Sequence, residues 1–211
     1  NSGTNTRSVS TLAAPGSTGT YDITVKAYAD DGCTDRVSNT FVLTDALVVA
    51  APSSPDLTVS KAASANPVTL PSANFNWVLT ITNGGGGPAV FGNSVTVLSD
   101  SLPQSGATYG SVSNSAGSSL TCSINGSQVL TCTSGSSGLN IAAGNSVTIT
   151  VPVVPSAAGT LQNPRSGGTC AVDPNTVVTE SSDANNACTS SSVTVNAGPA
   201  GGSTSRGTPT P

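Results

Sequence analysis

"FNWVLTITN", residues 75–83, alternates apolar side chains with polar or smaller ones. Phe75, Trp77, Leu79 and Ile81 share one parity, and a period of two is typical of a β-strand with one buried face. We therefore predict a central strand here. Its single tryptophan is expected to anchor an apolar core rather than to form an exposed ligand platform.

The same alternation recurs along the chain, whereas apolar periodicity of the helical kind does not persist over any long segment. About seven short strands separated by Gly, Pro and Asn turns are typical of a sandwich. The fold class that we predict is therefore all-β, with antiparallel β-sandwich domains in series. The strands expected in the larger domain are residues 56–63, 75–83, 93–103, 119–133, 145–154, 167–173 and 187–197.

Two further alternating stretches, 20–29 and 38–51, predict an N-terminal hairpin, with a third strand at 6–14. The segment "APSSP" then interrupts the strands, as a short linker does. The predicted organisation is a partial β segment at 1–50, a linker at 51–55, a sandwich at 56–197 and a flexible tail or linker at 198–211.

The first of these segments has too few strands for a sandwich, since a lone hairpin is marginal in water and leaves open sheet edges. Two explanations are open. Strands from a neighbouring copy of the same protein complete it, which would propagate head to tail into a filament. Alternatively, the chain is a fragment whose missing upstream strands complete it.

The amino-acid composition argues against several classes of function. Charged residues make up 8% of the 211 residues, aromatics 3%, and the net charge is −4, so we predict no nucleic-acid partner. No apolar run approaches the length of about 20 residues that a membrane-spanning helix needs. The sequence has no histidine and a single glutamate, which argues against acid–base catalysis. We therefore expect neither an enzyme nor a cofactor.

"DPNTVVTESSDANNAC", residues 173–188, gathers the acidic side chains Asp173, Glu180 and Asp183 beside three asparagines. A catalytic carboxylate pair is disfavoured, because a sugar-cleaving groove would also offer aromatic platforms. Calcium is the stronger alternative, but the stretch lacks the regular ligand spacing of a calcium loop. We favour a structural turn with no metal, in which Asp and Asn side chains satisfy backbone groups. For the aspartates in residues 28–36 we likewise favour a structural role without a bound metal.

Five cysteines are present, and none has zinc-site spacing. The close pairs Cys122/Cys132 and Cys170/Cys188 predict disulfides, and hence an oxidising, extracellular location. Cys33 is left over, either as a buried free thiol or as the partner of a cysteine in missing sequence or in another chain.

The hairpin that contains the first pair poses a register question. A strict two-residue Asn-Gly turn at 125–126 would place Cys122 opposite Val129, with Cys132 on the other face. A bulge or a longer loop centred on Ser127 would restore equal parity and allow the disulfide. We favour the disulfide.

Two short patterns match covalent modification sites. Asn125 begins the one N-glycosylation sequon, although the same residues are typical of a turn. Some bacterial sandwiches join a first-strand lysine to a last-strand asparagine with the help of an acid, and Lys61, Asn196 and Glu180 could take these roles. We favour a solvated Lys61.

Five stretches in order, "PDLTVSKAAS", "FNWVLTITNGGGGPA", "VTVLSDSLPQSGATYGSV", "LTCS…LTCT" and "LNIAAGNSVTITVPVV", resemble the conserved-repeat domain of unknown function found in tandem in bacterial surface proteins. The match covers almost all of 56–160. The stretch "VVTESSDANNACTSSSVTV" resembles the final hairpin of the cell-adhesion-related (CARDB-like) domain, and residues 19–47 are similar to the last hairpin of another bacterial immunoglobulin-like repeat. The resemblance implies immunoglobulin-like antiparallel β-sandwich domains in series, with a partial immunoglobulin-like β segment at 1–50. It also implies an extracellular setting and no catalytic residues.

The expected function is therefore that of a non-catalytic extracellular structural protein, either a stalk module or a subunit of a bacterial surface filament that self-associates by strand sharing. It would act at the cell surface or in a surface appendage. The alternative is an adhesion module that binds glycan or protein.

Overall fold

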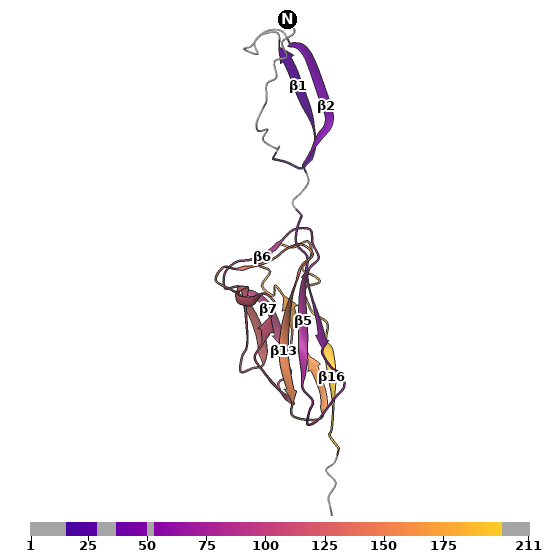
Figure 1. Cartoon of the computed structure of the whole chain (residues 1–211), viewed down its shortest axis with the longest axis vertical. Coiled ribbons are helices and arrows are strands. Elements are labelled where there is room, and N and C mark those ends of the chain that lie inside the picture. Colours follow the sequence, from indigo (N-terminus) through magenta and orange to yellow (C-terminus); the bar gives the residue numbers. More distant parts are fainter. Residues whose placement is uncertain (1–15, 29–36, 50–52, 200–211) are drawn as a thin grey trace, which may run out of the picture. The chain divides into compact units, whose positions relative to one another are not determined.

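The computed structural model describes residues 16–28, 37–49 and 53–199 (Figure 1). The chain divides after Pro52 into two compact units. No helix among the described residues is long and apolar enough to cross a membrane.

The N-terminal unit contains one antiparallel ribbon, formed by β1 (Gly19–Tyr28) and β2 (Val37–Val49). Residue 19 pairs with 49 and residue 28 with 37, and the register shifts twice along the ribbon. The predicted hairpin is therefore present. The predicted strand at 6–14 and Cys33 lie outside the described residues.

The C-terminal unit consists of short strands in several sheets, which confirms the all-β class and the immunoglobulin-like sandwich. Its elements are β3 (Leu57–Ala63), β4 (Val68–Thr69), β5 (Phe75–Asn83), β6 (Ala89–Phe91), β7 (Thr96–Ser101), β8 (Ala107–Tyr109), β9 (Ser113–Asn114), the 3₁₀ turn η1 (Gly117–Ser119), β10 (Leu120–Ile124), β11 (Val129–Ser134), β12 (Leu139–Ile141), β13 (Ser146–Pro155), β14 (Gly159–Asn163), β15 (Cys170–Val172) and β16 (Ser191–Asn196).

Two larger sheets form the body of this unit. One has the order β3-β5-β13-β8, with β9 also paired to β13, and the other has the order β10-β11-β7-β15. A third sheet, β14-β16-β4, contains the parallel pair β16–β4, and β12 pairs with β6. Contacts of β3 with both β15 and β16 connect the first sheet to the other two. The first strand thus lies where the three sheets meet.

The core is centred on β5, as its alternation predicts. Alternate residues of this strand are buried from Phe75 to Asn83, and those between them are partly exposed. Trp77 is fully buried, which confirms its predicted place in the core. Its ring packs edge-on against Phe75, with 5.2 Å between the ring centroids, a favourable arrangement for two aromatic quadrupoles.

The chain enters and leaves the sandwich at opposite ends (Figure 1). At one end, Leu57 pairs with Asn83 at the end of β5. At the other, Leu70 donates a backbone hydrogen bond to the carbonyl of Asn196, close to where β5 begins. Force applied along the chain would therefore run through the length of this unit.

The residues just before β3 lie against the sandwich although the sequence predicts a linker there. The carbonyl of Ser54 accepts hydrogen bonds from Gly86 (3.1 Å) and Gly87 (3.3 Å), and that of Pro55 accepts one from Ser181 (2.9 Å). A Cβ at Gly87 would overlap the backbone of residue 53. The turn formed by the four glycines at 84–87 thus allows residues 53–55 to pack closely against it, because it has no side chains.

Candidate functional site

The acidic stretch 173–188 forms hydrogen bonds mainly within the chain itself. Asp173 is buried, and its Oδ1 and Oδ2 accept hydrogen bonds from the backbone N–H groups of Val177 (3.0 Å) and Val178 (2.8 Å). Its positive φ of 40° is a turn conformation in which Asp is well tolerated. Both carboxylate oxygens are thus used to organise the turn.

Glu180 connects this stretch to the first strand. Its Oε2 accepts a short hydrogen bond from the backbone N–H of Leu57, and its Oε1 accepts one from the Nδ2 of Asn186 (3.0 Å). Burial raises the pKa of Glu180 above its usual range, against the effect of these hydrogen bonds. Asn185 extends the connection through its Nδ2, which donates to Asp56 at 3.0 Å.

We expect calcium to leave the stability of the protein nearly unchanged, because the carboxylates of Asp173 and Glu180 already accept hydrogen bonds from the chain. Differential scanning fluorimetry with millimolar calcium and with EDTA measures this. A site occupied at a hundred times its Kd would add about 2.7 kcal/mol, which raises Tm by roughly 5–10 °C for a protein of this size. A rise of that size, reversed by EDTA, would show that the protein binds calcium.

The structure brings each predicted cysteine pair to disulfide distance. Cys122 lies opposite Cys132 in the β10–β11 register, and Ile124 pairs with Leu130, which leaves residues 125–129 as the loop. This is the longer loop centred on Ser127, one of the two alternatives set out for the hairpin. Cys170 on β15 faces Cys188, which is the last residue of the acidic stretch 173–188.

Peptide mapping without reduction should therefore find these four cysteines in two linked peptides, Cys122 with Cys132 and Cys170 with Cys188. Mapping after reduction and alkylation is the control. Alkylation of the unreduced, folded protein at any of the four would contradict the pairing.

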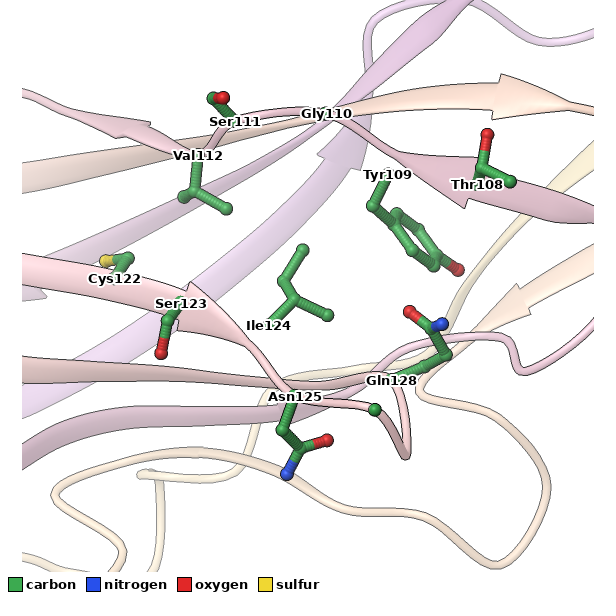
Figure 2. A pocket seen from close by; sticks show the side chains of 11 residues that line it. Thr108, Tyr109, Gly110, Ser111, Val112, Cys122, Ser123, Ile124, Asn125 and Gln128 are labelled. Carbon is green, nitrogen blue, oxygen red and sulfur yellow. The ribbon is translucent and has the colours of Figure 1, made fainter.

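A groove of about 760 Å³ lies beside the first pair, between the segments 108–112 and 122–128. Figure 2 shows Tyr109, Val112 and Ile124 pointing into it. The Tyr109 hydroxyl donates to the carbonyl of Pro103 at 2.7 Å, and burial raises the pKa of Tyr109. Asn125, the sequon residue, is exposed at the rim, where its Oδ1 accepts two backbone hydrogen bonds of the hairpin loop.

The main concentration of buried charge among the described residues lies elsewhere, at Lys61. The expectation that this lysine is solvated is wrong: its side chain and that of Asp100 are both 0% exposed. The Nζ of Lys61 lies 2.9 Å from the Oδ1 of Asp100 and donates to the Oδ1 of Asn163, also at 2.9 Å. The Nδ2 of Asn163 in turn donates to the Oδ2 of Asp100 at 3.0 Å. The three side chains form a closed triangle.

Three strands position this cluster, each by the same local rule. On β3, Lys61 has the same parity as the buried residues Leu57 and Val59. On β7, Asp100 has the parity of the buried Leu98. On β14, Asn163 has the parity of the buried Leu161. The β-pleat therefore points all three polar side chains into the sandwich. The sequence signal was available as a polar residue at an inward position. We missed Asn163 because β14 is short and was not predicted as a strand.

The partners that the sequence suggested for Lys61 are not the observed ones. Glu180 contacts the backbone at Leu57, and the Asn196 carbonyl accepts a hydrogen bond from Leu70 at the far end of the sandwich. The acid and the asparagine that contact Lys61 are instead Asp100 and Asn163. Lys61 is a first-strand lysine as proposed, but its asparagine comes from β14 and its acid from β7.

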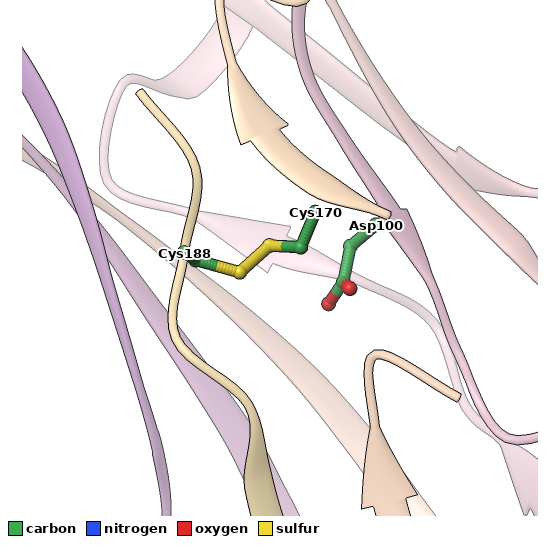
Figure 3. A group of neighbouring side chains, drawn as sticks. All are labelled: Asp100, Cys170 and Cys188. Carbon is green, nitrogen blue, oxygen red and sulfur yellow. A yellow bond between two sulfur atoms is a disulfide. The ribbon is translucent and has the colours of Figure 1, made fainter. Parts of the chain in front are cut away.

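Burial dominates the electrostatics of the cluster. It lowers the pKa of Lys61 and raises that of Asp100, in each case against the attraction of the partner charge, because a charged group loses hydration inside the sandwich. The Cys170–Cys188 pair lies beside Asp100, with its sulfur atoms and a carboxylate oxygen all within 4.8 Å of one another (Figure 3). The two sulfurs lie at disulfide distance from each other, so this group covers the cluster rather than forming a set of metal ligands.

Comparison with known proteins gives limited similarity. No protein-family model and no curated protein matches the chain. The crystal structure of the CARDB domain of a Pyrococcus furiosus protein, in complex with di-metal ions, is 16% identical and has a TM-score of 0.42, covering 69% of this chain and 96% of that one. A solution NMR structure of the same domain is 18% identical with a TM-score of 0.39, covering 67% and 95%. The chain is thus similar to a CARDB domain.

Proposed function

We propose that this protein is a non-catalytic structural element of the cell exterior, a stalk module or a filament subunit, which transmits tension along its length. The observation that supports this is the path of the chain, which enters the sandwich beside Asn83 and leaves it beside Leu70, at opposite ends (Figure 1). Modules with this arrangement can be joined in series, so that force passes through each one.

An extracellular location fits the same role. Two cysteine pairs at disulfide distance are typical of proteins that fold in an oxidising compartment. The scarcity of charge and the small aromatic content leave an aliphatic core, which covalent links would reinforce.

The N-terminal ribbon supports self-association. Val25 pairs with Phe41 and Ile23 with Leu43, which places four apolar side chains on one face of the ribbon. Phe41 is 63% exposed and Val25 is 53% exposed. An apolar face of this kind is a site for partner strands. We propose that a neighbouring copy of the same protein supplies them, in a head-to-tail arrangement that builds a filament.

Full-length protein should therefore form high-order oligomers by light scattering, and filaments by electron microscopy. Phe41→Ser should shift it to monomers, because a polar side chain disfavours the buried contact. Val90→Ser is the matched control, since Val90 is 56% exposed on the sandwich and takes no part in the ribbon.

Material from the native source gives the second readout. An intact mass near the calculated 20.4 kDa, together with oligomers that Phe41→Ser dissolves, supports strand sharing between copies. A much heavier chain would indicate that the strands completing the N-terminal unit belong to the same polypeptide. A monodisperse, folded monomer would refute strand sharing.

A further inference from the structure

The triangle of Lys61, Asp100 and Asn163 has the arrangement that a reaction between two of its members requires. We propose that Lys61 and Asn163 are joined by an intramolecular isopeptide bond, formed with Asp100 as the acid–base group.

Position is the first support for this inference. The Nζ of Lys61 is 2.9 Å from the Oδ1 of Asn163, and the carbon to be attacked, Cγ, is bonded directly to that oxygen. Groups held in such proximity react as if at very high concentration, because the entropy of bringing them together has already been lost on folding. The two residues lie 102 positions apart in sequence, so only the folded chain brings them together.

Protonation is the second support. A lysine is a nucleophile only as the neutral amine, and burial in apolar surroundings favours that form. Burial lowers the pKa of Lys61 and raises that of Asp100, which favours an amine facing a carboxylic acid. Arg165 opposes the shift of Asp100, while the neighbouring Tyr109 hydroxyl stays neutral.

The position of the carboxyl group between the two nitrogens is the third support. Its Oδ1 faces the Nζ of Lys61 and its Oδ2 faces the Nδ2 of Asn163. One group can therefore take a proton from the attacking nitrogen and give one to the leaving nitrogen. The cluster is fully buried and Cys170–Cys188 covers Asp100, so water is kept from competing for the amide.

The reaction balances without any other reagent. The Nζ–Cγ bond forms and the Cγ–Nδ2 bond breaks, and one proton passes from Nζ to Nδ2 by way of Asp100. The product is a secondary amide between the two side chains, and the leaving group is ammonia. Asp100 ends in the protonation state in which it began.

Such a bond would change how the sandwich responds to tension. A pull on residues 53 and 198 would run from β3 through the isopeptide to β14, so that the 102-residue span between the two linked residues could not extend. This consequence rests on the proposed structural role, whereas the bond itself does not.

Intact mass of the full-length protein, folded and then reduced, tests the bond directly. We expect a mass lower than calculated by one ammonia molecule. Trypsin gives the location, because it does not cut after an acylated lysine. The only lysines or arginines from residue 36 to 165 are Arg36, Lys61 and Arg165, so residues 37–165 should remain one peptide after digestion of the unfolded protein.

Two variants separate this reaction from other losses of ammonia, such as succinimide formation at the Asn-Gly step at 125–126. Asp100→Asn keeps the shape of the side chain but removes the acid, and Asn163→Ala removes the electrophile but keeps the Lys61–Asp100 pair. Both should have their full calculated mass and be cut after Lys61.

The wild-type mass decides the question even if a variant fails to fold. A folded wild-type protein of full calculated mass that trypsin cuts after Lys61 would overturn the proposal. So would a loss of ammonia that persists in both variants. Neither result depends on whether the protein forms filaments, so failure here is distinct from failure of the proposed function.

Discussion

Asp100→Ala should lower the free energy of unfolding by about 3–5 kcal/mol, because it removes one member of the buried Lys61–Asp100 pair and leaves the amino group of Lys61 without its partner. Asp100 is the only residue that forms a salt bridge with Lys61 among those described, and both side chains are 0% exposed. Urea unfolding followed by the fluorescence of the single tryptophan measures the change, since Trp77 lies in the core of the same unit.

Two comparisons isolate the buried pair. Asn163→Ala also prevents the proposed cross-link but keeps the Lys61–Asp100 pair, so we expect Asp100→Ala to be the less stable of the two. The double variant Lys61→Met with Asp100→Leu also lacks the cross-link and should be nearly as stable as Asn163→Ala, because replacing both members of a buried pair by apolar side chains is often nearly neutral. If Asp100→Ala lost less than about 1 kcal/mol, the pair would not be buried as the structure places it.

Trp77→Ala is the second substitution with a large expected effect, again about 3–5 kcal/mol, from the cavity left by a large aromatic side chain. For a protein of this size the corresponding fall in Tm is roughly 6–20 °C. Circular dichroism is the suitable measurement, since the variant has no tryptophan. The edge-on contact with Phe75 is lost as well.

Trp77→Phe and Val90→Ala are its controls. The indole Nε1 has no hydrogen-bond partner among the described residues, so Trp77→Phe should lose packing but no hydrogen bond and should cost less than Trp77→Ala. Val90→Ala removes an exposed side chain and should stay within about 0.5 kcal/mol of the wild type. Equal losses for Trp77→Ala and Val90→Ala would contradict the central position of Trp77.

The strands with strong alternation could be predicted from the sequence, because the period of two is a property of the local backbone. Residues 75–83 were predicted as a strand and form β5 with the same limits. Short strands were missed, among them β6, β12 and β14, since three to five residues give too few repeats of the pattern to distinguish a strand from a loop.

The two cysteine pairs that lie at disulfide distance could also be predicted from their local spacing in the sequence. Cys122 and Cys132 are close in sequence, and parity within one hairpin limits the possible registers. Tertiary structure then selected the loop centred on Ser127. The same holds for Asp173, whose turn-forming chemistry was predicted, whereas its two backbone donors are visible only in the fold.

The sequence by itself determined which side chains of the longer strands point inward, those of β5 above all, because alternation along a pleated strand is set by each strand alone. Only the tertiary structure decided that Lys61, Asp100 and Asn163 meet. They belong to three different sheets, separated by 39 and 63 residues along the chain. Which strands face each other depends on the packing of whole sheets, and no local pattern records that choice.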